Sequence, residues 1–470
     1  MTIDKFYRYS LILVGLLCLV GVARSATIVT DGPWTAKSSL GNVTATSLAD
    51  CRAKLASLPA PLKKRTDHCD LAIVTTVTKD PVPPVDPPPP PPPPVDPVPP
   101  VTSGTFTDLA SAPACARVTV YPAKTVTSAA AAGIPVHTGN CLEANPTTFT
   151  TAFWAAAKCG DVITLRAGTY TKTFGEGTWY FGQGETYRKC PAGQPLAVVA
   201  YPGEAVVFKP SSRPALIFGN GDRATEGADN LTFAGIQIVA GASCISGGGH
   251  TTDPSGGPDE TGGRNIRIVG VTCTITSTSE NTMTGLLDLQ NDGWKVLGNA
   301  FVDPVNRIVI NNNHGVYVQG GADDVEVAYN VFKLHVGHVI QNHQDGTPKL
   351  YERLSIHDNV IVGDGYGAMR GIGVINVADA STISIARNRI SHQGQDGWGC
   401  FNLYRGQISV TDNECADSQG GLNLNGQYGG SRKVTASGNK ICPVSGYPRT
   451  DAENGASLSQ LTETSPKACP

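Results

Sequence analysis

Short runs of alternating apolar residues recur along the second half of the chain, and six of them share one asparagine at the same position. The asparagines follow one another at intervals of 25–31 residues, which is the spacing of solenoid repeats. The pattern therefore predicts stacked coils with a sharp bend beside each asparagine. The runs are VLGNAF (296–301), VAYNVF (327–332), IHDNVI (356–361), IARNRI (385–390), VTDNEC (410–415) and ASGNKI (436–441).

The repeated asparagines are expected to be structural, because Asn tolerates the left-handed backbone of a bend and can bond to Asn in adjacent coils. Further apolar runs lie between them, so each coil contains at least three short strands. A two-layer sandwich also has short strands, but it needs no fixed turn residue in every unit. Two upstream variants, LTFAGIQI (231–238) and IRIVGVTC (266–273), continue the series without the asparagine.

A helix is expected over 146–161, with Phe149, Phe153, Trp154 and Ala157 on one side. A strand over 162–170 follows. Such a helix can cover the open N-terminal end of a β-stack. The alternative is a helix packed in an ordinary α+β core.

The asparagine run, repeated behind this helix and the segment CGDVITLRAGTY (159–170), resembles right-handed parallel β-helix proteins of the pectate-lyase-like superfamily. The resemblance covers about residues 150–445. It implies an all-β solenoid in which apolar side chains stack inside the coils, with an N-terminal capping helix. It does not fix the function, since this fold is shared by lyases, hydrolases, epimerases, phage tailspikes and adhesins.

Four segments are expected along the chain: a signal peptide (1–25), a small module (26–80), a proline-rich linker (81–101) and the β-helix domain (102–470). Basic residues precede a short apolar stretch, LILVGLLCLVGV, in the first segment, which predicts cleavage and secretion to the medium, cell surface or periplasm. No membrane span is then expected in the mature chain. An uncleaved anchor is the alternative.

The linker is expected to form an extended polyproline II spacer. The module before it is too small for a large core, so a disulfide should stabilise it. A helix is expected there around 47–58.

Removing the signal leaves an even number of cysteines, as expected in an oxidising compartment, and none has the spacing of a zinc site. Pairing sequence neighbours is a working assumption, because spacing alone does not fix connectivity. The expected pairs are Cys51–Cys69, Cys115–Cys141, Cys159–Cys190, Cys244–Cys273, Cys400–Cys415 and Cys442–Cys469.

Side chains alternate along a strand, so an inward apolar set defines an outward polar stripe across the coils. Amides and tyrosines in a row suit the hydroxyls and ring faces of an extracellular polysaccharide; an ordinary solvated sheet face is the alternative. With a net charge of −3, nucleic acid is not an expected partner. The outward set is Asp288, Gln290, Tyr317, Gln319, Gln341, His343, Asn402, Tyr404, Asn423 and Asn425.

The densest candidate chemistry lies within 338–405. For β-elimination in a uronate polymer, His343 is the candidate base, Arg370 and Arg405 the candidate charge stabilisers, and Tyr404 the candidate acid. Hydrolysis would instead need two facing carboxylates, for which Asp345 and Asp396 are the best pair. No strand carries the adjacent acidic residues that resemblance to polygalacturonases would require.

Two inserted loops could wall the groove. Aromatic residues of 174–190 either stack on sugars or pack as loop core. The glycine-rich loop 244–263 is expected to be a flexible lid; Ca²⁺ binding by its His250, Asp253, Asp259 and Glu260 is the weaker alternative, and no other cofactor or metal is expected.

The sequence thus predicts a secreted protein that binds a polysaccharide and cleaves it, by elimination at a uronate before hydrolysis. The rival prediction is a non-catalytic surface adhesin or a virus-like, tailspike-like glycan receptor-binding protein. A structural cell-wall component is a third. The sequence does not indicate an oligomeric state.

Overall fold

The computed structural model describes residues 34–38, 41–45, 68–71 and 139–469, the last range with gaps. The chain forms two compact units, residues 1–102 and 103–470. The predicted signal peptide, linker and 47–58 helix lie outside the described residues. The gaps are 172, 175–177, 182–187, 202, 211–213, 220–226, 242, 248–262, 277–285, 303–313, 320–321, 335–336, 344–347, 349, 364–369 and 394–398.

In the first unit, three antiparallel strands form a sheet in the order β2-β1-β3. They are β1 (Trp34–Ser38), β2 (Gly41–Ala45) and β3 (His68–Leu71).

The second unit is built from three sheets of parallel strands, each strand paired with its counterpart in the next coil. The first sheet contains β7 (Trp179–Tyr180), β10 (Leu216–Ile217), β13 (Ile245–Ser246), β16 (Leu287–Leu289), β19 (Val316–Val318), β22 (His338–His343), β25 (Arg370–Ile375), β28 (Phe401–Leu403), β31 (Leu422–Asn425) and β34 (Thr450–Glu453).

The second sheet contains β4 (Cys141–Ala144), β5 (Val162–Leu165), β8 (Leu196–Ala200), β11 (Leu231–Ala234), β14 (Arg267–Val269), β17 (Lys295–Leu297), β20 (Glu326–Ala328), β23 (Leu354–His357), β26 (Thr382–Ala386), β29 (Gly406–Thr411), β32 (Arg432–Ser437) and β35 (Leu461–Thr464). A 3₁₀ turn, η3 (Leu458–Gln460), precedes β35.

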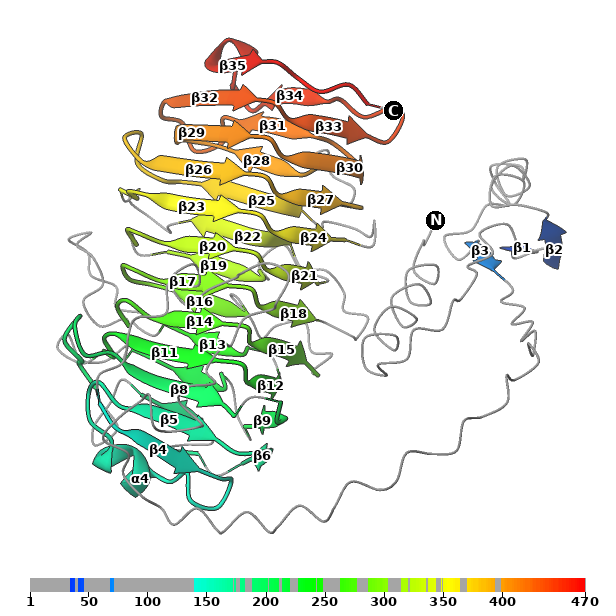
Figure 1. The fold of residues 1–470 in the computed structure, drawn as a ribbon. Helices are drawn as coiled ribbons and strands as arrows, with labels where there is room; N and C mark the ends of the chain where they lie inside the picture. Colours follow the sequence, from blue (N-terminus) through cyan, green and yellow to red (C-terminus); the bar gives the residue numbers. More distant parts are fainter. Residues whose placement is uncertain are drawn as a thin grey trace, which may run out of the picture. The chain divides into compact units, whose positions relative to one another are not determined.

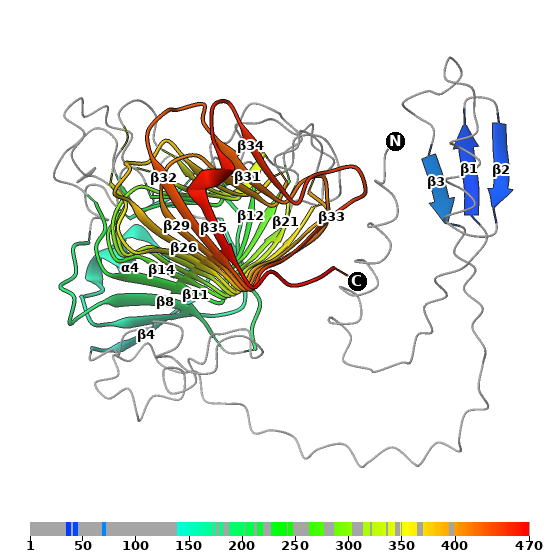
Figure 2. The same cartoon turned by 90° about the horizontal axis from the view of Figure 1, so that it is seen from above.

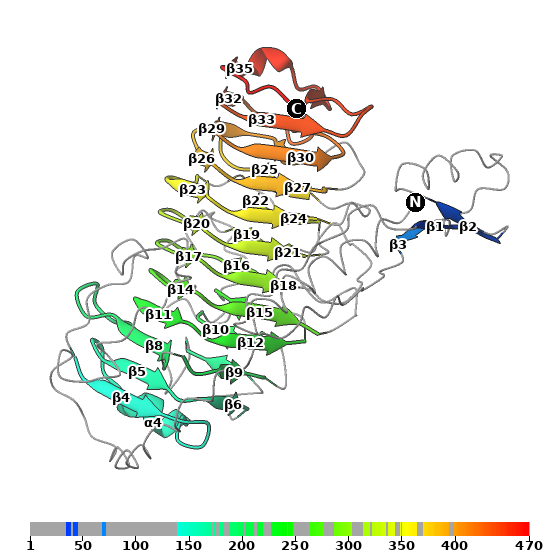
Figure 3. The same ribbon diagram turned by 45° about the vertical axis from the view of Figure 1, so that its right-hand side comes forward.

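The third sheet contains β6 (Gly168–Tyr170), β9 (Val206–Phe208), β12 (Gln237–Ala240), β15 (Thr272–Ile275), β18 (Ala300–Val302), β21 (Val331–Lys333), β24 (Val360–Val362), β27 (Arg389–Ser391), β30 (Glu414–Ser418) and β33 (Lys440–Pro443). Figure 3 shows these strands rising in order from β6 to β33.

Each coil visits the three sheets in turn, and the coils stack from β4 to β35 (Figure 1). Seen from above, strands of successive coils lie behind one another (Figure 2). Crossover connections between parallel strands of one sheet are right-handed in nearly all proteins. The predicted all-β fold, a right-handed parallel β-helix, is therefore confirmed.

Apolar side chains fill the interior as the alternation predicts. Leu287, Leu289, Val316, Val318 and Ile340 are fully buried. Each inward side chain lies in register with one in the next coil, as Leu287 does with Val316 and Val316 with Ile340. Burial of this kind requires the neighbouring coils, so the stack is stabilised as a whole.

The N-terminal end of the stack carries a helix shorter than predicted, α4 (Thr151–Ala156) (Figure 1). The Thr150 hydroxyl accepts a hydrogen bond from the Phe153 backbone and so begins the helix there. Trp154 and Phe149 are fully buried, and the Trp154 ring centroid lies 4.7 Å from that of Phe181.

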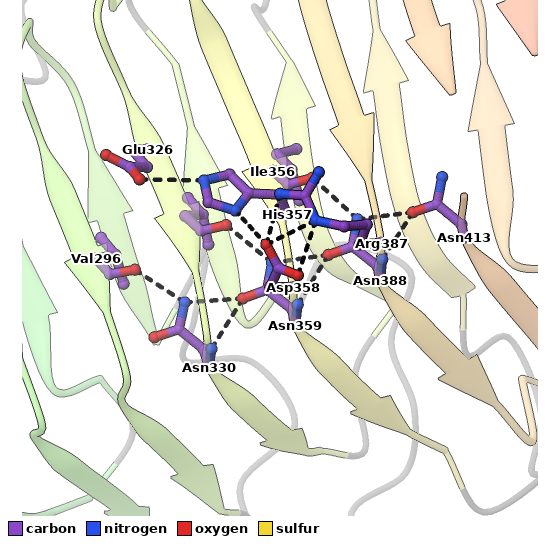
Figure 4. A network of polar contacts seen from close by, with 11 residues as sticks. Val296, Glu326, Asn330, Ile356, His357, Asp358, Asn359, Arg387, Asn388 and Asn413 are labelled. Carbon is purple, nitrogen blue, oxygen red and sulfur yellow. Dashed lines mark hydrogen bonds and ion pairs between the residues drawn. The ribbon is translucent and has the colours of Figure 1, made fainter. Parts of the chain in front are cut away.

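The repeated asparagines form a continuous ladder between the second and third sheets (Figure 4). Nδ2 of Asn330 donates to Oδ1 of Asn359 at 2.9 Å, and Nδ2 of Asn359 donates to Oδ1 of Asn388 at 2.9 Å. Each of these amides also donates to a carbonyl of the preceding coil, as Asn359 does to Val327 at 2.8 Å. The same pairing joins Asn299 to Asn330, Asn388 to Asn413 and Asn413 to Asn439.

One part of the explanation for these asparagines was wrong. The left-handed residue of each bend is the one before the asparagine, not the asparagine itself. The ladder position and the bend position are therefore separate residues. The left-handed residues are Gly298, Tyr329, Asp358, Arg387, Asp412 and Gly438.

Charged side chains beside the ladder join neighbouring coils: Arg387 pairs with Asp358, and His357 lies between Glu326 and Asp358 (Figure 4). Nε2 of His357 lies 3.1 Å from Oε1 of Glu326, and Nδ1 lies 2.7 Å from Oδ2 of Asp358. The hydrogen bond with Glu326 raises the pKa of His357 against the opposing effect of burial, and the same bond lowers the pKa of Glu326.

The stabilisation from His357 is expected to depend on pH. Because its folded pKa is raised, its contribution is complete below the ordinary value of 6.5 and is lost as pH rises through the folded pKa. Because the pKa of Glu326 is lowered, the contribution is complete above 4.5 and is lost as pH falls through its folded pKa. Between these values, His357→Gln should lower the free energy of unfolding by about 1 kcal/mol. Urea denaturation across the pH range measures this difference, and a difference that does not shrink at alkaline pH would contradict it.

Four predicted disulfides are confirmed: Cys159–Cys190, Cys244–Cys273, Cys400–Cys415 and Cys442–Cys469. Cys141 is also disulfide-bonded, but its expected partner, like that of Cys69, lies outside the described residues. Bonds of this kind persist in oxidising compartments, and they are compatible with an extracellular protein.

Candidate functional site

The predicted stripe lies on the outer face of the first sheet, where strand register arranges its side chains in two columns. One column runs Asp288, Tyr317, Gln341, Gly373, Asn402, Asn423 and Asp451. The other includes His343, Ile375, Tyr404, Asn425 and Glu453, with Gln319 and Gln290 continuing it. Adjacent members of a column are one strand spacing, about 4.8 Å, apart.

Most of this stripe is more enclosed than a solvated sheet face. Only Asp288, Gln319 and His343 are half-buried. Asp288 accepts hydrogen bonds from the side chains of Gln290 at 2.7 Å and Gln319 at 2.9 Å. The remaining members are buried: Gln290, Tyr317, Gln341, Asn402, Tyr404, Asn423 and Asn425.

Several of the buried amides have polar atoms without a partner. Both side-chain atoms of Asn423, Oδ1 of Asn402 and Nδ2 of Asn425 make no hydrogen bond. An unpaired buried polar atom costs about 1–3 kcal/mol, so such atoms in a native protein commonly meet water or a ligand. Their concentration on one sheet marks this face as a candidate binding site.

A buried histidine lies across the stripe at Gly373. Because glycine has no Cβ, the His338 ring occupies the space above it; a Cβ there would lie 2.6 Å from Cδ2 of His338. Nε2 of His338 lies 3.4 Å from Nδ2 of Asn402. Burial holds the pKa of His338 well below its ordinary value, so the ring is neutral and Nε2 can accept from the amide.

Gly373→Ala is expected to displace the His338 ring and the Asn402 amide. Overpacking of this kind costs about 1–3 kcal/mol, which should appear as a lower thermal unfolding midpoint. Gly193→Ala is the matched control, because a Cβ there meets no atom within 4 Å. Equal stability of the two variants would contradict the role of Gly373.

His343 lies between two tyrosines at the accessible side of the stripe. Its Nδ1 is 3.0 Å from the Tyr317 hydroxyl. Its ring centroid is 5.9 Å from that of Tyr428, which is 41% exposed, and Tyr428 in turn lies 5.4 Å from Tyr404. Tyr428 is not among the residues predicted from the sequence; its signal there is an aromatic residue in the glycine-rich segment GQYGG (426–430).

Arg370 supplies positive charge to the same group of residues. Burial is the main cause that raises the pKa of Tyr404 to about 12, and the Arg370 charge opposes it. Burial also lowers the pKa of His314 to about 3, with a further contribution from Arg370. His314 stacks on Tyr317 with ring centroids 4.9 Å apart, and it too is not among the residues predicted from the sequence. We call His314, Tyr317, His338, His343, Arg370, Asn402, Tyr404 and Tyr428 the histidine–tyrosine cluster.

Other predicted residues lie elsewhere. The Arg405 guanidinium binds Asp379, with Nε and Nη2 at 2.9 and 2.8 Å from Oδ1, so its charge is directed to that carboxylate. Asp345 and Asp396, the candidate hydrolytic pair, lie outside the described residues. So do the four candidate Ca²⁺ ligands of the glycine-rich loop.

The aromatic loop packs inward where the structure describes it. Trp179 and Phe181 are fully buried, and Trp179 stacks on Phe208 at 4.5 Å. Their role is that of core residues, not of a sugar platform.

A shallow groove of about 510 Å³ lies on the outer face of the second sheet. None of its lining residues is His, Asp, Glu or Tyr, so this groove offers no acid–base pair. It is lined by Arg353, Leu354, Ser355, Thr382, Ile383, Ser384, Gln407, Ile408, Ser409, Lys433 and Thr435.

Over the described part of the chain, no helix is long and apolar enough to cross a membrane. Within the same residues, no three His, Cys, Asp or Glu side chains are arranged to hold a metal ion.

No protein-family profile and no curated protein matches the chain. Among solved structures, the alginate lyase AlyGC of the PL6 family is 14% identical with a TM-score of 0.34, covering 64% of this chain and 34% of its own. A mannuronic acid-specific family 6 polysaccharide lyase from human gut microbiota is 11% identical, with a TM-score of 0.32 and coverages of 69% and 91%. Pectate lyase Pel9A is 15% identical, with a TM-score of 0.28 and coverages of 70% and 78%.

The chain thus spans about a third of the length of AlyGC. At these TM-scores the matches carry no argument about activity, and the fold assignment stands on the three parallel sheets.

Proposed function

We propose that this protein is exported, binds an extracellular polysaccharide on the first sheet and cleaves it by β-elimination at a uronate. The observation that carries the proposal is the histidine–tyrosine cluster. In it, Tyr428 lies between the half-buried His343 and the buried Tyr404, and the charge of the buried Arg370 acts on Tyr404. Unpaired amide atoms of Asn402 and Asn423 lie on the adjacent strands. Formation of four disulfides supports export.

The chemistry assigns one task to each group. In the tautomer that donates Nδ1–H to the Tyr317 oxygen, Nε2 of His343 carries the lone pair that takes the C5 proton of the uronate. The electron pair released from C5 forms the C4–C5 double bond as the C4–O bond breaks. Arg370 stabilises the negative charge that develops on the carboxylate during this step.

Tyr404 protonates the leaving oxygen. Burial raises its pKa to about 12, so the hydroxyl carries its proton at neutral pH. Nδ2 of Asn402 donates a hydrogen bond to the Tyr404 hydroxyl oxygen at 3.3 Å and holds the hydroxyl in place. The exposed ring of Tyr428 offers a sugar a flat apolar face at the edge of the cluster.

An absorbance assay tests the proposal, because each elimination creates an unsaturated uronate that absorbs near 235 nm. Purified protein is incubated with a panel of uronate polymers, and product ends are counted by a reducing-end assay. A parallel increase in absorbance at 235 nm and in reducing ends supports elimination. Reducing ends without absorbance would indicate hydrolysis and overturn the proposed chemistry.

A binding-only protein is the alternative outcome of the same test. It predicts retention on a glycan array, no turnover of any polymer, and binding that does not change in His343→Ala. Burial of the amide column is also compatible with this role, since binding alone can satisfy those amides.

A further inference from the structure

We infer that the subsite on the C-terminal side of Arg370 binds an uncharged sugar, so that the substrate alternates uronate with uncharged residues. This inference rests on the proposed function and specifies its substrate class. A polymer made only of uronates would place a carboxylate in this subsite.

The first reason for this inference is the residue composition of the two columns. Beyond β25, the columns present Asn402 and Tyr404 on β28, then Asn423 and Asn425 on β31. On β34 they present Asp451 and Glu453, in register with Asn423 and Asn425. Over these three strands neither column contains a Lys or Arg.

The second reason is the hydrogen-bonding requirement of the unpaired amide atoms. Nδ2 of Asn402 already faces His338 and Tyr404, whereas its Oδ1 has no partner. Asn423 lacks a partner on both Oδ1 and Nδ2, and both residues are almost fully buried. A carboxylate only accepts hydrogen bonds, so it would leave both oxygens unpaired. A hydroxyl or an N-acetyl group donates as well as accepts and can satisfy them.

The third reason is electrostatic repulsion by the carboxylates of β34. Asp451 lies one strand spacing from Asn423 and two from Asn402, which is about 5 and 10 Å along the stack. The Debye length at physiological salt is about 8 Å, so a carboxylate bound over Asn423 is repelled by Asp451 and Glu453. Arg370 is three strand spacings, about 14 Å, from β34, so it escapes most of this repulsion and can still bind one uronate.

The test compares polymers that share a uronate but differ in its neighbour. Hyaluronan, unsulfated chondroitin and unsulfated dermatan alternate a uronate with an uncharged N-acetylhexosamine; polyglucuronate, polymannuronate and polygalacturonate do not. We expect kcat/KM, measured at 235 nm, to be about tenfold or more higher for an alternating polymer. One polar group that is left unpaired or is repelled has an effect of about this size. Equal or faster cleavage of a homopolymer would overturn this inference and leave the proposed function intact. No elimination with any polymer would overturn both.

A charge-removing double variant, Asp451→Asn with Glu453→Gln, tests the electrostatic step. We expect it to reduce the preference for the alternating polymer by about threefold at low salt and by less at high salt. Asp417→Asn is the matched control, since its side chain is 70% exposed on the third sheet. If the double variant and the control give the same preference, the assignment of Asp451 and Glu453 is wrong.

Discussion

His343→Gln should lower kcat for uronate elimination by about 10²–10⁴-fold, the usual contribution of general acid–base catalysis. Glutamine keeps a polar group beside the Tyr317 hydroxyl, which lies 3.0 Å from Nδ1 in the native protein. It has no basic nitrogen, however, and cannot take the C5 proton. Because His343 is only half-buried, we expect thermal unfolding to change little.

The measurement is the initial rate at 235 nm on the best polymer, with unfolding followed by circular dichroism. His392→Gln is the matched control: this histidine follows β27 of the third sheet, where burial lowers its pKa, and it lies outside the cluster. We expect the control to retain full activity. A loss below about threefold in His343→Gln, less than any general base supplies, would remove the histidine from the mechanism.

Much of the fold could be predicted because its signals are local and periodic. Alternation of apolar residues sets which side chains face inward, and one residue type recurs at one place in each coil. The disulfides were predictable for a related reason. Cys159–Cys190, Cys244–Cys273 and Cys442–Cys469 are separated by 27–31 residues, about one coil, so sequence neighbours lie side by side.

The candidate site was less predictable because its features depend on contacts between coils. Alternation placed Asn402 on the outer face, but it could not indicate that the side chain is fully buried. Nor could it indicate that His338 lies over Gly373, which depends on the register of β22 with β25, where His338 pairs with Arg370 and Gln341 with Gly373. Arg405 is adjacent to Tyr404 in sequence, yet it binds Asp379.

Asparagine has two roles in this protein, and the hydrogen-bond partners of each side chain distinguish the two roles better than the sequence does. In the ladder, every asparagine from Asn330 to Asn413 donates and accepts between coils. On the first sheet, Asn423 is equally buried but has no partner on either side-chain atom. The ladder therefore stabilises the stack, whereas the amide column retains the capacity to bind a ligand.

The ladder predicts the largest stability effect. Asn359→Asp keeps the shape of the side chain but removes its amide donor. Nδ2 of Asn359 donates to the Val327 carbonyl at 2.8 Å and to Oδ1 of Asn388 at 2.9 Å, and an aspartate would turn an oxygen toward both acceptors. An uncompensated buried charge costs about 3–5 kcal/mol, and we expect a loss of about that size in the free energy of unfolding at neutral pH.

Asn439→Asp is the matched control at the end of the ladder, where the amide nitrogen donates only to the Val410 carbonyl at 2.7 Å. The loss in the free energy of unfolding should be clearly smaller for Asn439→Asp, because the new carboxylate faces one hydrogen-bond acceptor, whereas in Asn359→Asp it faces two. Burial and the facing oxygens should raise the folded pKa of Asp at position 359, so its penalty is full above that pKa and shrinks as pH falls below it and an O–H donor returns. Urea denaturation at neutral and acidic pH measures both variants. Equal losses at the two positions, or a loss at position 359 that does not change with pH, would mean that the ladder stabilises the coils by packing and not by its hydrogen bonds.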